Sequence, residues 1–252
     1  PAPDCVAVAG SARLLRYGVE NGRAPGVFIP SLINPPQVLD LSESRSMLRH
    51  MCAAGHDAYL VDWGAPTHRD AAMGLDAHIT ERLLPLLADL PRPPILAGYC
   101  LGGTFAIAAA MLREVTAVVA IASPWTFDGF ADADRQEISV LWRDAKAICE
   151  RLGYVPMEVL QSGFWAMDPK RTIQKYAAFA DMEKGSDAAR AFLAVEDWAN
   201  EGAPLTYAAA RDLFDDLYAG DATGEGRWSV GGQLIDPKAL PCPSLSIRST
   251  TD

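Results

Sequence analysis

Cysteine is scarce in this sequence, and none of its five cysteines belongs to a CxxC pair. The five lie far apart, at Cys5, Cys52, Cys100, Cys149 and Cys242. An odd number of cysteines at long spacings favours neither a disulfide framework nor a zinc site. We therefore expect no bound metal, and we expect the protein to work in the reducing cytoplasm.

Long apolar runs and basic clusters are missing as well. No run is long enough to span a bilayer and no secretory signal peptide is visible, so we expect no membrane span. The net charge of −10 would repel a phosphate backbone, which argues against nucleic-acid binding. The sequence begins without Met and stops abruptly at Asp252, so we expect a fragment of a longer protein.

Short apolar runs alternate with helical patterns in the first half of the chain. This alternation is typical of an α/β fold, in which a mainly parallel sheet has helices on its faces. The length of 252 residues suits a single domain with a sizeable core. Strands are predicted at residues 27–30, 58–62, 95–98 and 115–122, and helices at residues 42–54, 75–90 and 102–113.

The pattern changes after about residue 131. Residues 132–219 carry long helical segments and no convincing strand, which predicts a helical cap insertion laid over the sheet. Residues 1–131 and 220–252 are then expected to form the core. Within the second core segment, residues 228–235 favour a small hairpin, and residues 244–247 resume a core strand.

The strongest chemical signal is the hexapeptide at residues 98–103, GYCLGG, which has the pattern of a nucleophile elbow with Cys in place of Ser. Such a nucleophile sits on a strained strand-to-helix turn, where glycines two places away relieve steric crowding. The turn presents the thiol at the carboxyl edge of the sheet and at a helix N-terminus, whose dipole favours thiolate. A strand is expected before the motif and a helix after it. We therefore interpret Cys100 as the nucleophile of an α/β-hydrolase fold rather than as a structural cysteine.

An elbow of this kind needs two oxyanion-hole donors. One is normally the backbone N–H after the nucleophile, which here belongs to Leu101. The other comes from the loop after an earlier strand, and residues 31–36 form that loop. We expect the N–H of Ile33 to supply the second donor, with Leu32 as the alternative.

The acid and the base of a catalytic triad should follow the nucleophile along the chain. Asp252 comes directly after the last expected strand and is the favoured acid, with Asp128 as its rival. No histidine follows Cys100, because the four histidines are His50, His56, His68 and His78. Each of these is interpreted as a surface or capping residue, so the expected base would lie beyond Asp252.

Together these landmarks resemble the polyhydroxyalkanoate synthases, especially the short, class III-like forms. The resemblance runs from about Arg13 to the last residue. It is carried by residues 30–34 (PSLIN), 38–41 (VLDL), 55–63 (GHDAYLVDW), 98–104 (GYCLGGT) and 244–252. The cap, including residues 198–202 (WANEG), looks more like a branch of short synthase-like hydrolases.

This resemblance implies a function and its partners. A 3-hydroxyacyl-coenzyme A would acylate Cys100, Asp252 would support catalysis, and a growing polyester chain would be the second partner. Coenzyme A enters as part of the substrate, and no cofactor is expected. The resemblance also implies a histidine base, which no residue here matches, so we expect this fragment to be inactive without a downstream histidine. A homodimer or a partner subunit, and a place at the polymer granule surface in the cytoplasm, are further expectations.

Two other functions stay open on the sequence. A thioesterase or esterase could use the same Cys100, with water in place of the hydroxyl that extends a polyester. A non-catalytic fold used for binding is the third reading, because no histidine follows the nucleophile. The products formed from a 3-hydroxyacyl thioester would separate the first two functions.

Overall fold

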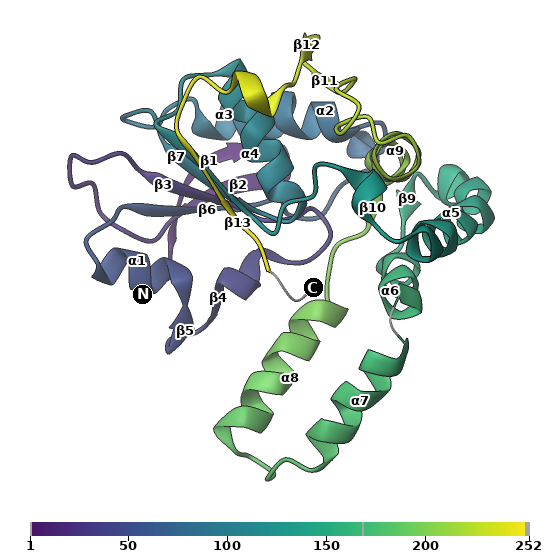
Figure 1. The fold of residues 1–252 in the computed structure, drawn as a ribbon. Helices are drawn as coiled ribbons and strands as arrows, with labels where there is room; N and C mark the ends of the chain where they lie inside the picture. The colour runs from purple at the N-terminus through teal and green to yellow at the C-terminus, as the bar shows by residue number, and fades with distance from the viewer. Residues whose placement is uncertain (1, 168, 250–252) are drawn as a thin grey trace.

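The computed structural model describes residues 2–167 and 169–249, and its centre is a seven-stranded sheet in the order β1-β2-β6-β3-β7-β8-β13 (Figure 1). The five strands from β6 to β13 in that order are parallel. At the opposite edge, β1 and β2 join antiparallel. The strand bounds are β1 Asp4–Ala9, β2 Ala12–Arg16, β3 Gly26–Ile29, β6 Ala58–Asp62, β7 Ile95–Tyr99, β8 Ala117–Ile121 and β13 Ser244–Ile247.

Helices cover both faces of this sheet, which is why its central strands are almost continuously apolar (Figure 1). On one face, Leu48 of α1 packs in a small buried cluster with Phe28 and Leu60. On the other face, the fully buried Phe105 of α4 belongs to the main hydrophobic cluster, which also includes side chains of α2 and α3. The bounds are α1 Met47–Ala53, α2 Leu75–His78, a π-helical turn η3 Ile79–Leu83, α3 Leu84–Leu87 and α4 Leu101–Leu112.

This arrangement confirms the predicted fold class, a mainly parallel sheet with flanking helices. The predicted strands at residues 58–62 and 244–247 match β6 and β13, and the other three predicted strands are found as β3, β7 and β8 within two residues of their expected ends. The helix expected from residue 42 begins later. Short strands β4 (Asp40–Ser42) and β5 (Arg45–Ser46) come first, and Ser46 then caps α1 by accepting the N–H of Arg49 at 3.0 Å.

The antiparallel strands β1 and β2 were not predicted from the sequence. Val6 and Val8 of β1 are 47% and 66% exposed, because β1 lies at one edge of the sheet. Sequence patterns find strands by a buried face, and an edge strand with exposed valines lacks most of that signal. The pair extends the sheet beyond β6 without adding a parallel strand.

Residues 132–219 are mainly helical, as predicted, but two short strands occur among them. β9 (Tyr154–Val155) and β10 (Leu205–Thr206) pair antiparallel, so the prediction of no strand is wrong at these points. The division of the chain into a core and a cap stays a prediction.

The helices are α5 Asp132–Leu152, α6 Met157–Met167, α7 Pro169–Ala180, α8 Asp187–Asn200, α9 Tyr207–Arg211 and the π-helical η5 Asp212–Ala219. The expected hairpin follows as β11 Ser229–Val230 and β12 Gln233–Leu234.

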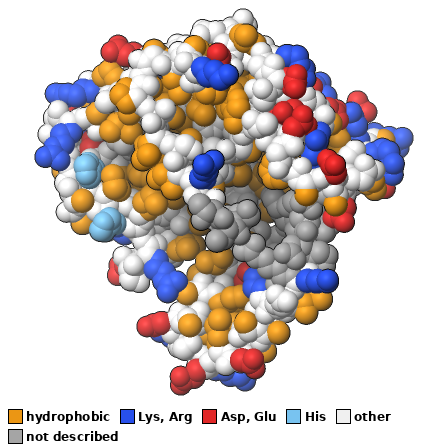
Figure 2. Space-filling model, viewed as in Figure 1, with side chains coloured by type: hydrophobic (Ala, Val, Ile, Leu, Met, Phe, Trp, Pro, Cys, Tyr) orange, Lys and Arg blue, Asp and Glu red, His pale blue; other side chains and the backbone are white. Residues whose placement is uncertain are grey.

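Helices α7 and α8 lie side by side and project away from the sheet (Figure 1). Phe179 and Phe192 stack between them at a centroid distance of 4.4 Å. Other apolar side chains of this pair remain exposed, including Ile173 and Leu193, and hydrophobic side chains are visible on it in Figure 2. In the described ranges, no helix is both long and apolar enough to cross a membrane.

The main hydrophobic cluster generates a stability prediction. Phe105→Ala should lower the free energy of unfolding by about 3–5 kcal/mol, because it removes a fully buried ring that packs edge-on against Trp63. Val8→Ala, at an exposed strand position, should change the same quantity by about 0.5 kcal/mol or less. Urea unfolding followed by circular dichroism measures both values. Equal losses in the two variants would contradict this description of the core.

Candidate active site

Cys100 occupies a strained turn between β7 and α4, at the position expected for an elbow nucleophile. Its φ of 51° and ψ of −133° lie in a region that residues other than glycine rarely adopt. Two backbone hydrogen bonds hold the turn: the Cys100 N–H donates to the carbonyl of Ile121 at 2.9 Å, and the Cys100 carbonyl accepts the Gly103 N–H at 2.9 Å. The strand–turn–helix context predicted from the motif is therefore present.

The glycines of the motif are required by close backbone contacts. A Cβ on Gly98 would lie 2.2 Å from the Gly102 carbonyl oxygen, and a Cβ on Gly102 would lie 2.0 Å from the Ile29 carbonyl oxygen. A Cβ on Gly103 would lie 1.8 Å from the hydroxyl of Ser123. The start of α4 thus packs directly on β3 and β7, which fixes where Cys100 sits.

The thiol of Cys100 lies beside two hydrogen-bond donors. The Leu101 N–H and the Ser31 hydroxyl are both within hydrogen-bonding reach of the sulfur. Ser31 is buried and follows β3, and its Oγ accepts the N–H of Ile33 at 3.3 Å. The loop after β3 therefore reaches the nucleophile through a serine. This loop was predicted from the sequence, but the contact of Ser31 with the thiol was not. The sequence feature that could have identified Ser31 is a hydroxyl next to the expected oxyanion donors.

Burial raises the pKa of the Cys100 thiol, and the Leu101 N–H and the Ser31 hydroxyl lower it by a smaller amount. Burial has the larger effect because the free energy lost when a thiolate is removed from water exceeds the free energy gained from its two hydrogen-bond donors. The thiol is therefore protonated at neutral pH. It needs a base, or a higher pH, to become nucleophilic.

The predicted oxyanion donors lie on the two elements that meet at Cys100. Leu101 is the first residue of α4, and its N–H points to the sulfur as expected for an elbow. The N–H of Ile33 donates to Ser31, so it could serve a substrate oxygen only by sharing or leaving that bond. The oxyanion roles of Leu101 and Ile33 stay predictions.

The predicted acid Asp252 lies outside the described residues. The strand before it, β13, is parallel to β8 and ends at the same edge of the sheet as β7, the strand that leads to Cys100. The rival Asp128 is an exposed residue in an ion pair with Arg135 at 2.7 Å. That pairing links Asp128 to α5 at the protein surface.

The four histidines differ in exposure. His50, His56 and His68 are exposed, and the buried His78 donates from Nδ1 to the Gly74 carbonyl at 2.8 Å. Burial lowers the pKa of His78, so its ring is neutral at pH 7. In the part of the chain that the structure describes, no hydrogen bond joins a histidine to Cys100.

One cluster of carboxylates has the spacing of a metal site. Oxygens of Asp128, Asp221 and Glu225 lie within 4.8 Å of one another. However, Asp221 accepts the N–H of Phe127 at 2.8 Å, and Asp128 is paired with Arg135. These local partners account for two of the three carboxylates.

Tyr218 of η5 is a neighbour of Cys100 that sequence reasoning did not identify. Burial raises the pKa of its phenol to about 12, and the negative charge of a Cys100 thiolate adds to this rise. Tyr218 also lines a small cavity of about 40 Å³ with Ile33 and Phe214. The helical segment thus contributes a wall to the region of the nucleophile.

Curated proteins with similar sequences are polyhydroxyalkanoate polymerases. The poly(3-hydroxyalkanoate) polymerase subunit PhaC of Thiocystis violacea is 29% identical over 255 residues, which cover 95% of this chain and 70% of that protein. PhaC of Haloarcula marismortui is 27% identical over 242 residues, which cover 92% of this chain and 51% of that protein. The chain thus spans about half the length of some of these relatives. No family model matches the sequence. The resemblance to the polyhydroxyalkanoate synthases is confirmed.

Solved structures of α/β-hydrolase esterases have the same fold. A thermophilic esterase from Thermogutta terrifontis superposes with a TM-score of 0.54 at 13% identity, covering 98% of this chain and 79% of that one. A carboxylesterase from the thaumarchaeon Nitrososphaera superposes with a TM-score of 0.55 at 14% identity, covering 99% and 81%. A protein called AqDC, described as cleaving the ring of the Pseudomonas quinolone signal, gives 0.58 at 15% identity, covering 98% and 81%. These similarities establish the fold as α/β-hydrolase.

The glycine contacts of the elbow generate the next prediction. Gly98→Ala should destabilise the protein by about 1–3 kcal/mol or more, because the new Cβ would force the elbow backbone away from Gly102. Gly129→Ala is the matched control, since a Cβ there meets nothing within 4 Å. Thermal unfolding measures both variants. A Gly98→Ala protein as stable as the control would show that the elbow is looser than described.

The thiol environment generates a prediction about pH. Alkylation of Cys100 by iodoacetamide should be slow at pH 7 and should accelerate as the pH rises, because burial moves the pKa of the thiol above its usual value. Ser31→Ala should shift the midpoint of this profile to still higher pH, because the variant loses a donor to the thiolate. Mass spectrometry of the Cys100 peptide gives the rates. A midpoint that falls in Ser31→Ala would refute the assigned role of Ser31.

Proposed function

We propose that this chain is the catalytic part of a polyhydroxyalkanoate synthase, an acyltransferase that polymerises 3-hydroxyacyl-coenzyme A through a thioester on Cys100. The observation that carries the proposal is a cysteine on the strained elbow, with φ of 51°, at the N-terminus of α4. Its support comes from the polymerases that the sequence resembles along 90–95% of this chain. The activated acyl group arrives as a coenzyme A thioester, so the proposal requires no cofactor.

The first step transfers the acyl group to the enzyme. The Cys100 thiolate attacks the thioester carbonyl carbon, and the resulting oxyanion is held by the Leu101 N–H and a donor of the loop after β3. The bond between that carbon and the coenzyme A sulfur then breaks, and coenzyme A leaves as a thiolate that takes up a proton. One thioester replaces another, so the step needs little free energy.

The second step extends the chain. The 3-hydroxyl of an incoming 3-hydroxyacyl group attacks the Cys100 thioester, its proton passes to a base, and the sulfur leaves as the new ester forms. Water would release the acyl group as free acid, so the site must favour a held hydroxyl over bulk solvent. The buried surroundings of the Cys100 thiol favour that outcome.

A thioesterase or esterase is the second candidate function. The observation that favours it is the fold, which is shared with esterases of 13–14% identity. Such an enzyme would use the same elbow and the same acylation step, and water would then attack the Cys100 thioester. The two functions therefore differ in the product and not in the nucleophile.

Localisation at the granule surface and association with a second copy or a partner subunit belong to the same proposal. The exposed apolar side chains of α7 and α8, such as Ile173 and Leu193, are consistent with contact with an apolar surface. The charged side chains at the tip of this pair would remain in water (Figure 2).

The test uses 3-hydroxybutyryl-coenzyme A. We expect a 3-hydroxybutyryl adduct on the Cys100 peptide, formed slowly by this chain because no histidine in the described residues hydrogen-bonds to the thiol. Cys100→Ala should abolish the adduct, and Cys5→Ala, at an exposed cysteine, should leave it intact. Peptide mapping by mass spectrometry identifies the site.

The products then decide between the two functions. A polymerase should yield ester-linked oligomers, and a thioesterase should yield monomeric 3-hydroxybutyrate in equal amount to the released coenzyme A. Chromatography with mass detection separates these products. An adduct on another cysteine would contradict both functions, because both place the acyl group on Cys100.

A further inference from the structure

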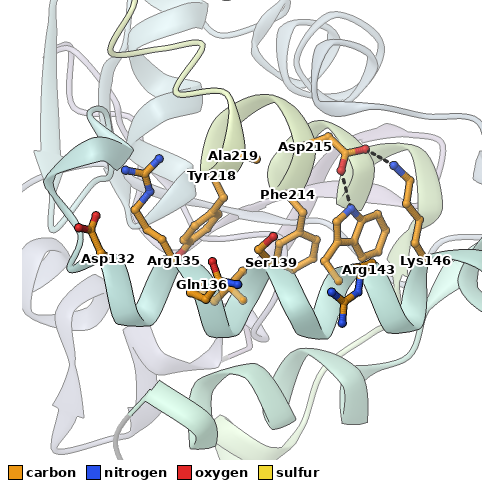
Figure 3. Close-up of a pocket in the computed structure, with 12 residues that line it drawn as sticks. Asp132, Arg135, Gln136, Ser139, Arg143, Lys146, Phe214, Asp215, Tyr218 and Ala219 are labelled. Carbon is orange, nitrogen blue, oxygen red and sulfur yellow. Dashed lines mark hydrogen bonds and ion pairs between the residues drawn. The ribbon is translucent and has the colours of Figure 1, made fainter.

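A groove of about 620 Å³ lies between α5 and η5 (Figure 3). Its floor is aromatic: Trp142 of α5 packs against Phe214 of η5 at a centroid distance of 5.0 Å, and Phe214 lies 6.1 Å from Tyr218. Polar side chains of α5, including Gln136 and Ser139, form its rim. The groove therefore combines an apolar floor with hydrogen-bonding edges.

The cations of this groove are already neutralised by carboxylates. Lys146 Nζ lies 2.5 Å from Asp215 Oδ2, and Figure 3 shows this contact beside the hydrogen bond from Trp142 to Asp215. The other two cations are also paired, Arg135 with Asp128 at 2.7 Å and Arg143 with Asp144 at 3.0 Å. An anionic ligand would have to displace these carboxylates, in a protein whose net charge is −10. An uncharged ligand would meet no such cost.

The groove shares part of its lining with a small cavity beside the loop that contacts the nucleophile. Ile138, Phe214 and Tyr218 line both the groove and the small apolar cavity of about 40 Å³. The wall of that cavity includes Ile33, whose N–H donates to Ser31, and Ser31 in turn lies against the Cys100 thiol. Tyr218, which lines both cavities, is also close enough to Cys100 for a thiolate charge there to affect its phenol.

The length of the groove sets the size of its ligand. From Asp132 to Lys146 the groove follows α5 for about 21 Å, at about 1.5 Å per residue. A 3-hydroxyacyl unit contributes four backbone bonds, and extended chains advance about 3.3–3.6 Å for every three bonds, so one unit spans about 4.5 Å. The groove is therefore long enough for four complete units.

We propose that the groove between α5 and η5 binds the uncharged polyester chain as it leaves Cys100, and not the anionic coenzyme A. This inference rests on the proposed polymerase function and assigns a binding site for its product. The apolar backbone and side groups of the chain lie on the ring floor of Trp142, Phe214 and Tyr218, and the ester carbonyls accept hydrogen bonds from the polar rim.

The test is a binding measurement that needs no turnover. The probe is the methyl ester of a 3-hydroxybutyrate tetramer, which is uncharged, and coenzyme A is the anionic comparison. Ser139→Trp places a large ring in the groove from an exposed position of α5, and Ala147→Trp places the same ring at an exposed position of α5 outside it. Calorimetry gives each affinity, and circular dichroism confirms that both variants are folded.

We expect the tetramer to bind the unmodified chain and Ala147→Trp equally, and to bind Ser139→Trp at least about tenfold more weakly, a loss of about 1.4 kcal/mol. Gln136→Trp, also exposed on the rim, should have the same effect and replaces Ser139→Trp if that variant does not fold. Coenzyme A affinity should be unchanged in all variants.

Three results would overturn the assignment: no binding of the tetramer, equal binding to the Ser139→Trp variant, or a loss confined to coenzyme A. Failure of the polymerase function would be seen separately, as a missing adduct on Cys100 or as monomeric 3-hydroxybutyrate with no oligomer. The two experiments therefore fail independently, since one reads covalent acylation and the other reads non-covalent affinity.

Discussion

The close approach of α4 to the central strands is the constraint on which the site depends. At the start of α4 the backbone passes so near to β3 and β7 that a Cβ at Gly98 or Gly102 would lie 2.2 Å or less from a carbonyl oxygen. That contact forces Cys100 to a φ of 51° and turns its side chain out of the sheet. The strain is tolerated because both neighbours of β7, the strands β3 and β8, pair with it along its length.

The same packing decides the chemistry of the thiol. A helix N-terminus and two donors favour thiolate, yet burial outweighs them and keeps Cys100 protonated. A thiol in these surroundings is a slow nucleophile by itself, but the same surroundings would also help to keep water from an acyl group placed on it. The thioester must persist until a hydroxyl attacks it, and hydrolysis before that attack would stop growth of the polyester chain. Protection from water is therefore more important for this reaction than a low thiol pKa.

The parts of the site that could be predicted from sequence are those with a local cause. The elbow at Cys100 was predicted because glycines mark it in neighbouring positions, and the strand Ala117–Ile121 was predicted because it is rich in β-branched residues. The contact of Ser31 with the thiol and the place of Tyr218 were not predicted. Both arise when segments far apart in the chain pack together, and no spacing within either segment records that contact. The edge strand β1 was missed because exposed valines lack a buried face.

The helical segment and the sheet meet at Tyr218, and this meeting links the nucleophile to the groove. Burial raises the pKa of the Tyr218 phenol to about 12, and a thiolate charge on Cys100 adds to this rise, so a second negative charge is unfavourable there. Because a second negative charge is unfavourable in this region, the region favours uncharged groups such as esters. Along α5, Arg135 and Lys146 are neutralised by ion pairs with carboxylates, so the groove also lacks a strong attraction for anions. The electrostatics near Cys100 and those of the groove therefore select the same kind of ligand, although they are built from different residues.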